Sequence, residues 1–283
     1  MTPWIAIAGS VAMHVLWNLL VRHQGKSVRL LWWALAAHCL LLGPWGIHAL
    51  ATEANWTPVL AVCLLASSLA NVAYFVALDR AYHHAPVALV YPMVRSSPLL
   101  IGIWSMWLFG ESLGISAWGA MLVSVSGLVL LAATAWRNDA RAALSWAFTA
   151  ALATSVYSLT DKAATAYLPS LSSVLGFITV GYGLSFVAIS WMLYREHGSL
   201  RPARRPSLAV MLAAGLCIGL AYILVIHAMR GMSAAVVVAF TNAGIVIAGL
   251  LSLFVFNERA HWLPRLTGMC LITLGLILLA IFR

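Results

Sequence analysis

Charged side chains are scarce in this sequence of 283 residues: 8% are Asp, Glu, Lys or Arg, whereas 63% are hydrophobic. A soluble domain carries about 25% charged residues, which form the polar shell around its apolar core. This chain lacks the residues for such a shell, so its composition excludes a soluble globular protein. We expect the lipid bilayer to be the solvent for most of its surface.

The features of several other protein classes are missing too. The four cysteines stand singly in apolar runs without a CxxC pair, so we expect core residues and no disulfide framework. No spacing of His, Cys, Asp or Glu is typical of a metal site, and no motif indicates a cofactor. The net charge of +9 comes from residues in short gaps between apolar runs, which argues against a nucleic-acid partner.

Long apolar segments dominate what remains. A helix needs about 20 apolar residues to cross the hydrocarbon core. Alternating strand patterns are absent, and an open sheet could not satisfy its backbone hydrogen bonds in lipid. The sequence predicts an all-α polytopic membrane protein with ten transmembrane helices, at residues 3–22, 30–51, 57–78, 86–109, 114–136, 143–164, 172–194, 207–229, 233–256 and 262–282.

The two halves of the chain resemble each other. Ala81 to Ala88 is echoed by Ala228 to Ala235, and Phe109-Gly110-Glu111 is echoed by Phe256-Asn257-Glu258. Weak internal similarity of this kind is typical of transporter repeats, and it predicts two five-helix repeats, residues 1–140 and 141–283. Because five is odd, the second repeat enters the membrane from the opposite side, which makes the repeat inverted.

Basic residues set the expected orientation in the membrane. One set of loops carries most of the Lys and Arg residues, whereas the other set and the termini carry only Lys162, Arg230 and Arg283. By the positive-inside rule the richer set is cytoplasmic. We therefore expect a multi-pass protein of the cell membrane, the inner membrane of a bacterium, with both termini on the non-cytoplasmic side.

Ten helices in two halves, with a Gly-Glu or Asn-Glu pair closing the penultimate helix of each half, resemble the EamA-type branch of the drug/metabolite transporter superfamily. The likeness covers essentially the whole chain and is carried, with second-half counterparts, by Ala85-Pro86-Val87-Ala88, Pro98, Phe109-Gly110-Glu111, Gly119 and Gly127. Ile245 stands where Pro98 stands in the first half, which argues against a matching kink. The opening His14-Val15-Leu16-Trp17-Asn18 is similar to permeases of this branch found alongside phosphonate-utilisation functions.

The resemblance implies an exporter or exchanger of small polar metabolites, with a cavity lined by helices one, three, four, six, eight and nine. Several of these helices carry a polar or aromatic face, since residues three or four apart share a face. Such groups also bond neighbouring helices to one another, the plainer interpretation for any single residue. As a group they predict a substrate site made of His14, Trp17, Asn18, Asn71, Tyr74, Tyr91, Arg95, Tyr157, Asp161, Tyr222 and Asn242.

Arg95 is the sharpest feature of this set, since it lies about ten residues into the fourth predicted span, where a charge costs at least about 2.5 kcal/mol. We expect its guanidinium to bind an anionic or zwitterionic solute, the alternative being an ion pair with Asp161. Asp161 itself, followed by Lys162, also fits an interfacial pair. His14 is either a proton carrier or a buried neutral side chain. Acidic residues inside the spans are few, which leaves facilitated diffusion or exchange open.

Three functional classes were weighed. A secondary transporter with alternating access fits the repeats best. A lipid-carrier flippase or its accessory subunit is the alternative, since Arg95 also suits a lipid phosphate. A membrane-embedded enzyme is remote because no HExxH motif, deep carboxylate pair or Ser-Lys pair is present. One chain already supplies both repeats, so a monomer suffices for transport, although a homodimer is also compatible with the sequence.

The orientation is testable by fusion. A reporter that is active only in the cytoplasm, fused after Arg283, is expected to stay silent because the positive-inside rule places the C-terminus outside. The same reporter inserted after Arg201 should be active. A bright signal from the C-terminal fusion would contradict the orientation or the helix count.

Overall fold

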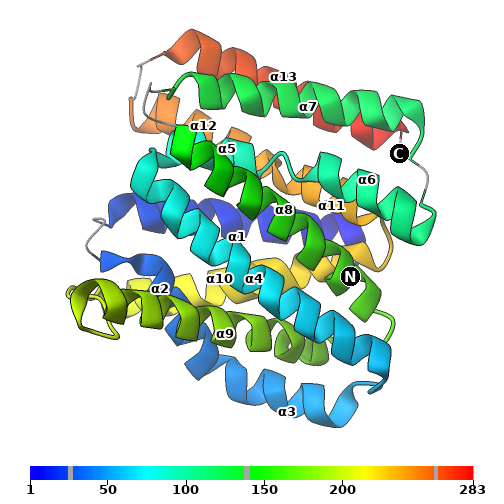
Figure 1. Cartoon of the computed structure of the whole chain (residues 1–283). Coiled ribbons are helices and arrows are strands. Elements are labelled where there is room, and N and C mark those ends of the chain that lie inside the picture. Colours follow the sequence, from blue (N-terminus) through cyan, green and yellow to red (C-terminus); the bar gives the residue numbers. More distant parts are fainter. Residues whose placement is uncertain (25–27, 112, 137–140, 258–260, 283) are drawn as a thin grey trace. The chain divides into compact units, whose positions relative to one another are not determined.

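The computed structural model contains helices and no strand over the residues that it describes, which are 1–24, 28–111, 113–136, 141–257 and 261–282 (Figure 1). Helices close their backbone hydrogen bonds within one segment, which the bilayer demands of an apolar chain. The elements are α1 Pro3–His23, α2 Leu30–Leu41, α3 Gly43–Glu53, α4 Pro58–His84, α5 Val87–Val94, α6 Pro98–Phe109, α7 Ile115–Ala133, α8 Arg141–Ala164, α9 Leu171–His197, α10 Leu208–Met229, α11 Ala234–Thr241, α12 Ala243–Leu250, the π-helical turn η2 Leu251–Val255, and α13 Trp262–Phe282.

Eight of the described helical segments are long and apolar enough to cross a membrane. The bent pair α2–α3 raises this number to nine if it forms one span, and Pro3–Trp17 of α1 is a shorter apolar helix. The all-α polytopic prediction is confirmed, whereas the count of ten spans stays a prediction. Large apolar side chains such as Trp107 and Ile115 are well exposed, which suits a surface solvated by lipid.

Three of the predicted spans are broken. The predicted helix 30–51 bends by 55° between α2 and α3, where Gly43 and Pro44 begin the second piece. The span Val87–Phe109 is interrupted between α5 and α6, just before Pro98. The second half has a shorter interruption: α11 ends at Thr241 and α12 begins at Ala243, with only Asn242 between them, so the breaks of the two halves are not strictly symmetric.

No proline stands at the second-half break, but the hydroxyl of Thr241 donates a hydrogen bond to the carbonyl of Val238 at 2.6 Å. Such back-bonding offers the Val238 carbonyl a partner other than the helix ladder.

The described chain forms two compact units, each of which draws on both halves of the sequence. Unit 1 consists of Met1–Val76 and Thr160–Gly231, and unit 2 of Ala77–Leu159 and Met232–Arg283. The chain passes between them within α4, within α8 and in the loop before α11. The predicted repeats 1–140 and 141–283 are divisions of the sequence, and residue 140 lies outside the described ranges, so this boundary stays a prediction.

Small residues hold the helices of unit 1 close together. A Cβ atom on Gly176 of α9 would lie 2.0 Å from the carbonyl oxygen of Gly46 on α3, so the two backbones are in direct contact. A GxxxG motif on α10 plays the same part: Gly215 and Gly219 lie against Ala37 and His38 of α2. The apolar core beside these contacts is built around Phe177, which is 1% exposed.

Unit 2 uses the same device between α7 and α13, which lie side by side in Figure 1. A Cβ atom on Gly127 would lie 2.5 Å from the carbonyl oxygen of Gly268. Gly110 after α6 and Asn257 after η2 both adopt left-handed backbone, with φ of 65° and 54°. These two positions are equivalent in the repeat, so the halves end their penultimate helices in the same way. Glu258, the second of the two repeated acids, lies among the residues left undescribed.

The α3–α9 contact predicts a strong stability effect. Gly176→Ala places a methyl group on the Gly46 carbonyl, and overpacking of this kind costs about 1–3 kcal/mol. Gly183→Ala on the same helix is the matched control, since a Cβ there meets nothing within 4 Å. Thermal unfolding of the purified variants in detergent should show a lower Tm for Gly176→Ala and an unchanged or higher one for Gly183→Ala. Equal Tm values would contradict the close contact.

Candidate functional site

The breaks of α5–α6 and α11–α12 bring repeat-equivalent residues of unit 2 together. Arg95 follows α5, and Asn242 follows α11; the two are 147 positions apart, the same spacing as Phe109 and Phe256. The Nδ2 amide of Asn242 donates to the backbone carbonyl of Arg95 at 3.1 Å. Contact between equivalent residues is what a pseudo-two-fold relation gives close to its axis.

The guanidinium of Arg95 is held by hydroxyl groups. Its Nη1 donates to Oγ1 of Thr241 at 3.0 Å, and its Nη2 donates to the phenol oxygen of Tyr91 at 2.5 Å. Its Cζ atom lies 4.9 Å from the centre of the Tyr91 ring, within cation–π range. Both of these partners are hydroxyl groups, and they orient the plane of the guanidinium. Tyr91, Arg95, Thr241 and Asn242 are called the Arg95 cluster below.

Two buried polar atoms at these breaks have no hydrogen-bond partner among the described residues. They are Oδ1 of Asn242, whose side chain is 1% exposed, and Oγ of Ser97, which is also 1% exposed. Buried polar atoms are nearly always paired, so each unpaired one calls for an explanation such as a ligand or a water. Both belong to unit 2 and flank the starts of α6 and α12.

A second group of predicted residues meets in unit 1 around Asp161. This carboxylate is fully buried and accepts hydrogen bonds at both oxygens: Oδ1 from Oγ of Ser67 at 2.5 Å, and Oδ2 from the phenol of Tyr222. Asn71, one turn after Ser67 on α4, donates to the Ser67 carbonyl at 3.0 Å. Asp161 is thus buried among its hydrogen-bond partners, and the alternative of an interfacial pair with Lys162 stays a prediction. Ser67, Asn71, Asp161 and Tyr222 are called the Asp161 cluster.

The other predicted site residues take less specific places. His14 and Trp17 are half-buried on α1, and Trp17 packs beside an apolar cluster of Leu30, Ala34 and Ala214. Tyr74 packs edge-on against Phe75 at 5.0 Å. Tyr157 is half-buried on α8 in the part that belongs to unit 2. The Asn18 side chain lies outside the described part of the chain.

Sequence reasoning left three polar residues out of the predicted site. Ser67 and Thr241 lie on the polar faces that predicted the site, one turn before Asn71 and directly before Asn242, yet they bond the two charged residues themselves. Ser97 carries no sequence signal beyond its place before Pro98. Ser67 and Thr241 lie 94 and 146 positions from the charged residues that they contact, so both needed the tertiary contact.

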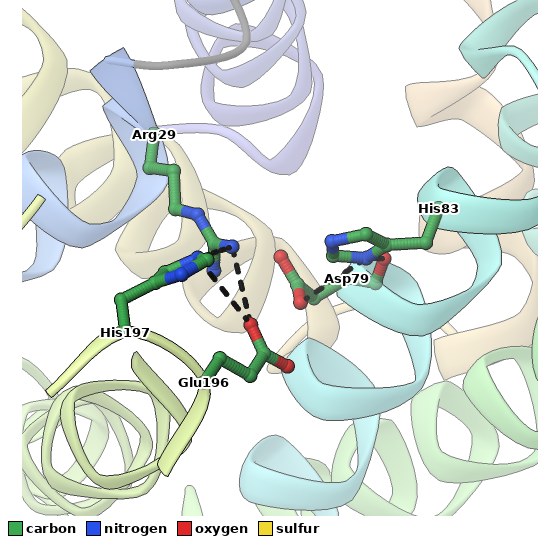
Figure 2. Close-up of polar contacts among 5 residues, drawn as sticks. All are labelled: Arg29, Asp79, His83, Glu196 and His197. Atoms are coloured by element: carbon green, nitrogen blue, oxygen red, sulfur yellow. Dashed lines mark hydrogen bonds and ion pairs between the residues drawn. The ribbon is translucent and has the colours of Figure 1, made fainter. Parts of the chain in front are cut away.

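Charged groups at the helix ends form local pairs instead of a metal or catalytic site. Figure 2 shows Arg29 beside Glu196 and His197 at the end of α9, with Nη2 of Arg29 3.2 Å from Oε2 of Glu196. It also shows His83 on Asp79 of its own helix, with Nδ1 of His83 3.6 Å from Oδ2 of Asp79. Within the described residues no group of three His, Cys, Asp or Glu side chains is placed to hold a metal ion.

Comparison with solved structures shows the fold. One crystal structure of a protein matches this chain with a TM-score of 0.72 and 21% sequence identity, covering 99% of this chain and 98% of the other. No curated protein matches the chain.

The family follows from the sequence model that matches. The model of the EamA-like transporter family matches twice, over residues 3–133 and 141–281, and so covers the chain as two repeats. With its apolar helices and its two clusters of buried polar residues, the chain belongs to the EamA-like transporter family and is a multi-pass membrane transporter of the drug/metabolite transporter superfamily.

Proposed function

We propose that this protein is a secondary transporter that exports or exchanges small anionic or zwitterionic metabolites by alternating access. The observation that carries the proposal is the guanidinium of Arg95, which sits where α5 breaks before α6 and is held by Thr241 next to the break of α11. Discontinuous helices at corresponding positions of two repeats are the best structural pointer to a transporter's binding site.

A charge inside a membrane span is costly and usually serves a function. Insertion scales put the cost of an arginine at the centre of a span at about 2.5–3.5 kcal/mol. Tyr91 and Thr241 recover part of this cost through hydrogen bonds that also fix the plane of the guanidinium. A planar, oriented guanidinium binds carboxylate or phosphonate groups with paired hydrogen bonds, which supports an acidic group on the solute.

Two unpaired hydrogen-bond acceptors at the same breaks suit a zwitterionic solute, which carries a positive as well as a negative group. Oδ1 of Asn242 and Oγ of Ser97 are buried without a described partner and can accept hydrogen bonds from an ammonium group. A cationic donor and neutral acceptors in one unit match a solute with both a carboxylate and an amine, as in amino-acid-like compounds. The starts of α6 and α12 add positive dipole ends to which a carboxylate is attracted.

Alternating access is supported by how the repeats are distributed. Each compact unit contains helices from both halves of the chain, and the backbone crosses between units at only a few points. Inverted repeats permit two packings of similar energy, which a transporter needs to open to either side in turn. Flux in the outward direction or by exchange is part of this proposal.

Arg95→Gln tests the proposed site. The variant keeps a polar side chain but loses the charge and the paired donors, so we expect at least tenfold less transport, as for the loss of about 1.5–3 kcal/mol from a charged hydrogen bond. The readout is the small-molecule content of cells and medium in a bacterial strain that overexpresses wild type or variant at equal membrane levels. Arg265→Gln is the matched control, since Arg265 also donates to a hydroxyl in unit 2, that of Ser252 at 2.7 Å.

Each outcome of this comparison has a distinct meaning. A solute class moved by wild type and by Arg265→Gln, but not by Arg95→Gln, supports both transport and the site. Unchanged transport by Arg95→Gln removes Arg95 from the site. No change in any profile, with lipid scrambling by purified protein in vesicles, would replace the proposal with the lipid-flippase function.

Thr241→Val tests how the guanidinium is held. The isosteric change removes the acceptor for Nη1 of Arg95 and leaves its charge, so we expect weaker apparent affinity, by about tenfold, with little change in maximal rate. Thr273→Val on α13 is the matched control, because that hydroxyl bonds only one turn back within its own helix, to Met269. The measurement is transport against external concentration of the solute identified with wild type, and equal apparent affinities would exclude the positioning role.

A further inference from the structure

We propose that Asp161 is the proton-binding residue through which this transporter couples solute movement to the proton gradient. The inference rests on the proposed transport function, but it concerns a different unit and a different group from the Arg95 cluster. Acidic residues within membrane spans are rare, and proton relays are a recurrent reason for their presence.

Asp161 is buried, and hydrogen bonds from neighbouring residues offset the cost of burying its carboxyl group. Its side chain is 0% exposed in a span that is otherwise largely apolar, where an ionised carboxylate without partners would be very costly. Both oxygens accept hydrogen bonds, from Ser67 on α4 and from Tyr222 on α10. Among the described residues neither Lys nor Arg pairs with it, so no fixed positive charge holds it in the ionised form.

Hydroxyl partners suit both protonation states of a carboxyl group. An ionised carboxylate accepts at both oxygens, whereas a protonated one must also donate. The hydroxyls of Ser67 and Tyr222 can donate to the first form, and either can rotate to accept from the second. The cluster can therefore take up and release a proton without leaving a buried polar atom unpaired, which a structural ion pair does not allow.

The surroundings contain few other titratable groups. Tyr222 on α10 bonds the carboxylate, and Cys63 on α4 lies close enough to interact with its charge. Lys162 is the next residue on α8. The adjoining cluster contributes apolar side chains from α9, among them Phe177 and Ile178. Asp161 is thus the carboxyl group of this cluster.

The position of the cluster links proton binding to the rest of the cycle. Asp161 lies just after α8 enters unit 1, and Ser67 lies on α4 before that helix leaves it. These are the two helices that continue from one unit into the other. When Asp161 takes a proton, the hydrogen bond from Ser67 or the one from Tyr222 must reverse or break. Protonation therefore changes how three helices are joined, which is the kind of local change that biases a two-state element.

Infrared spectroscopy of purified protein in lipid vesicles tests this directly, with the proton as the only ligand. The chain has seven Asp and Glu residues, so its carboxyl bands are few. We expect a protonated-carboxyl band that disappears reversibly as pH is raised across the range in which the protein stays folded. The band should be absent from Asp161→Asn and retained in Glu111→Gln, a control carboxyl that also accepts from a serine, Ser105 at 2.6 Å.

A second variant keeps the test decisive if Asp161→Asn fails to fold. Tyr222→Phe removes one hydrogen bond to the carboxyl group, so its band should move to higher wavenumber. A band that persists in Asp161→Asn, or that is unmoved by Tyr222→Phe, would assign the proton to another residue. Absence of any titrating band in wild type would equally overturn the proposal.

Coupling is measured in the cell assay used for transport. A protonophore should abolish the wild-type change in metabolite profile. Asp161→Asn should retain exchange, and this exchange should no longer respond to the protonophore. For wild type, a pH gradient of one unit corresponds to about a tenfold difference in solute accumulation. Protonophore-sensitive transport by Asp161→Asn would refute coupling through this residue. A titrating band at Asp161 in a protein that moves no solute would instead count against the transport proposal alone.

Discussion

A backbone carbonyl released by a helix break inside a bilayer has no water to bond, and the rest of this structure depends on how that need is met. The carbonyl of Arg95 is exposed by the break between α5 and α6, and the side chain of Asn242 donates to it. Irregular backbone at membrane depth is tolerated only where protein or a cavity satisfies it. The break thus requires the partner helix, and the partner helix is broken at its equivalent residue. This mutual dependence holds Arg95 in place.

Close backbone contacts supply the rigidity that such a site needs. Lipid tails are as apolar as leucine, so helices in a membrane gain little from hydrophobic burial and depend on packing. Gly46 with Gly176 in unit 1, and Gly127 with Gly268 in unit 2, let backbones touch where a single methyl group would not fit. Glycine thus sets the separation of α3 from α9 in unit 1 and of α7 from α13 in unit 2.

The two clusters stabilise buried side chains of opposite charge in a similar way. Arg95 and Asp161 are each contacted by one tyrosine and one small hydroxyl residue from other elements or turns. These hydrogen bonds lower the cost of burying a charged group. In the proposed cycle the cation binds the solute and the acid binds the proton, so each unit contributes one ionic event.

The sequence by itself determined the solvent, the class of protein and three of the four members of each cluster. Scarce charge required a membrane, apolar runs required helices, and the echo of Ala81 to Ala88 in Ala228 to Ala235 indicated the repeat. Polar residues at helical spacing selected Tyr91, Arg95, Asp161, Tyr222 and Asn242, because few polar side chains are tolerated in lipid.

Only the tertiary structure decided which of these residues meet. No proline marks the interruption at Asn242, so the structure was needed to locate it, together with the hydrogen bonds of Thr241 to Val238 and of Asn242 to Arg95. The burial of Asp161 was missed because its neighbour Lys162 suggests an interface, whereas Ser67 and Tyr222 come from helices far away in sequence. Periodicity describes one helix at a time, and hydrogen bonds between helices depend on packing that no single helix encodes.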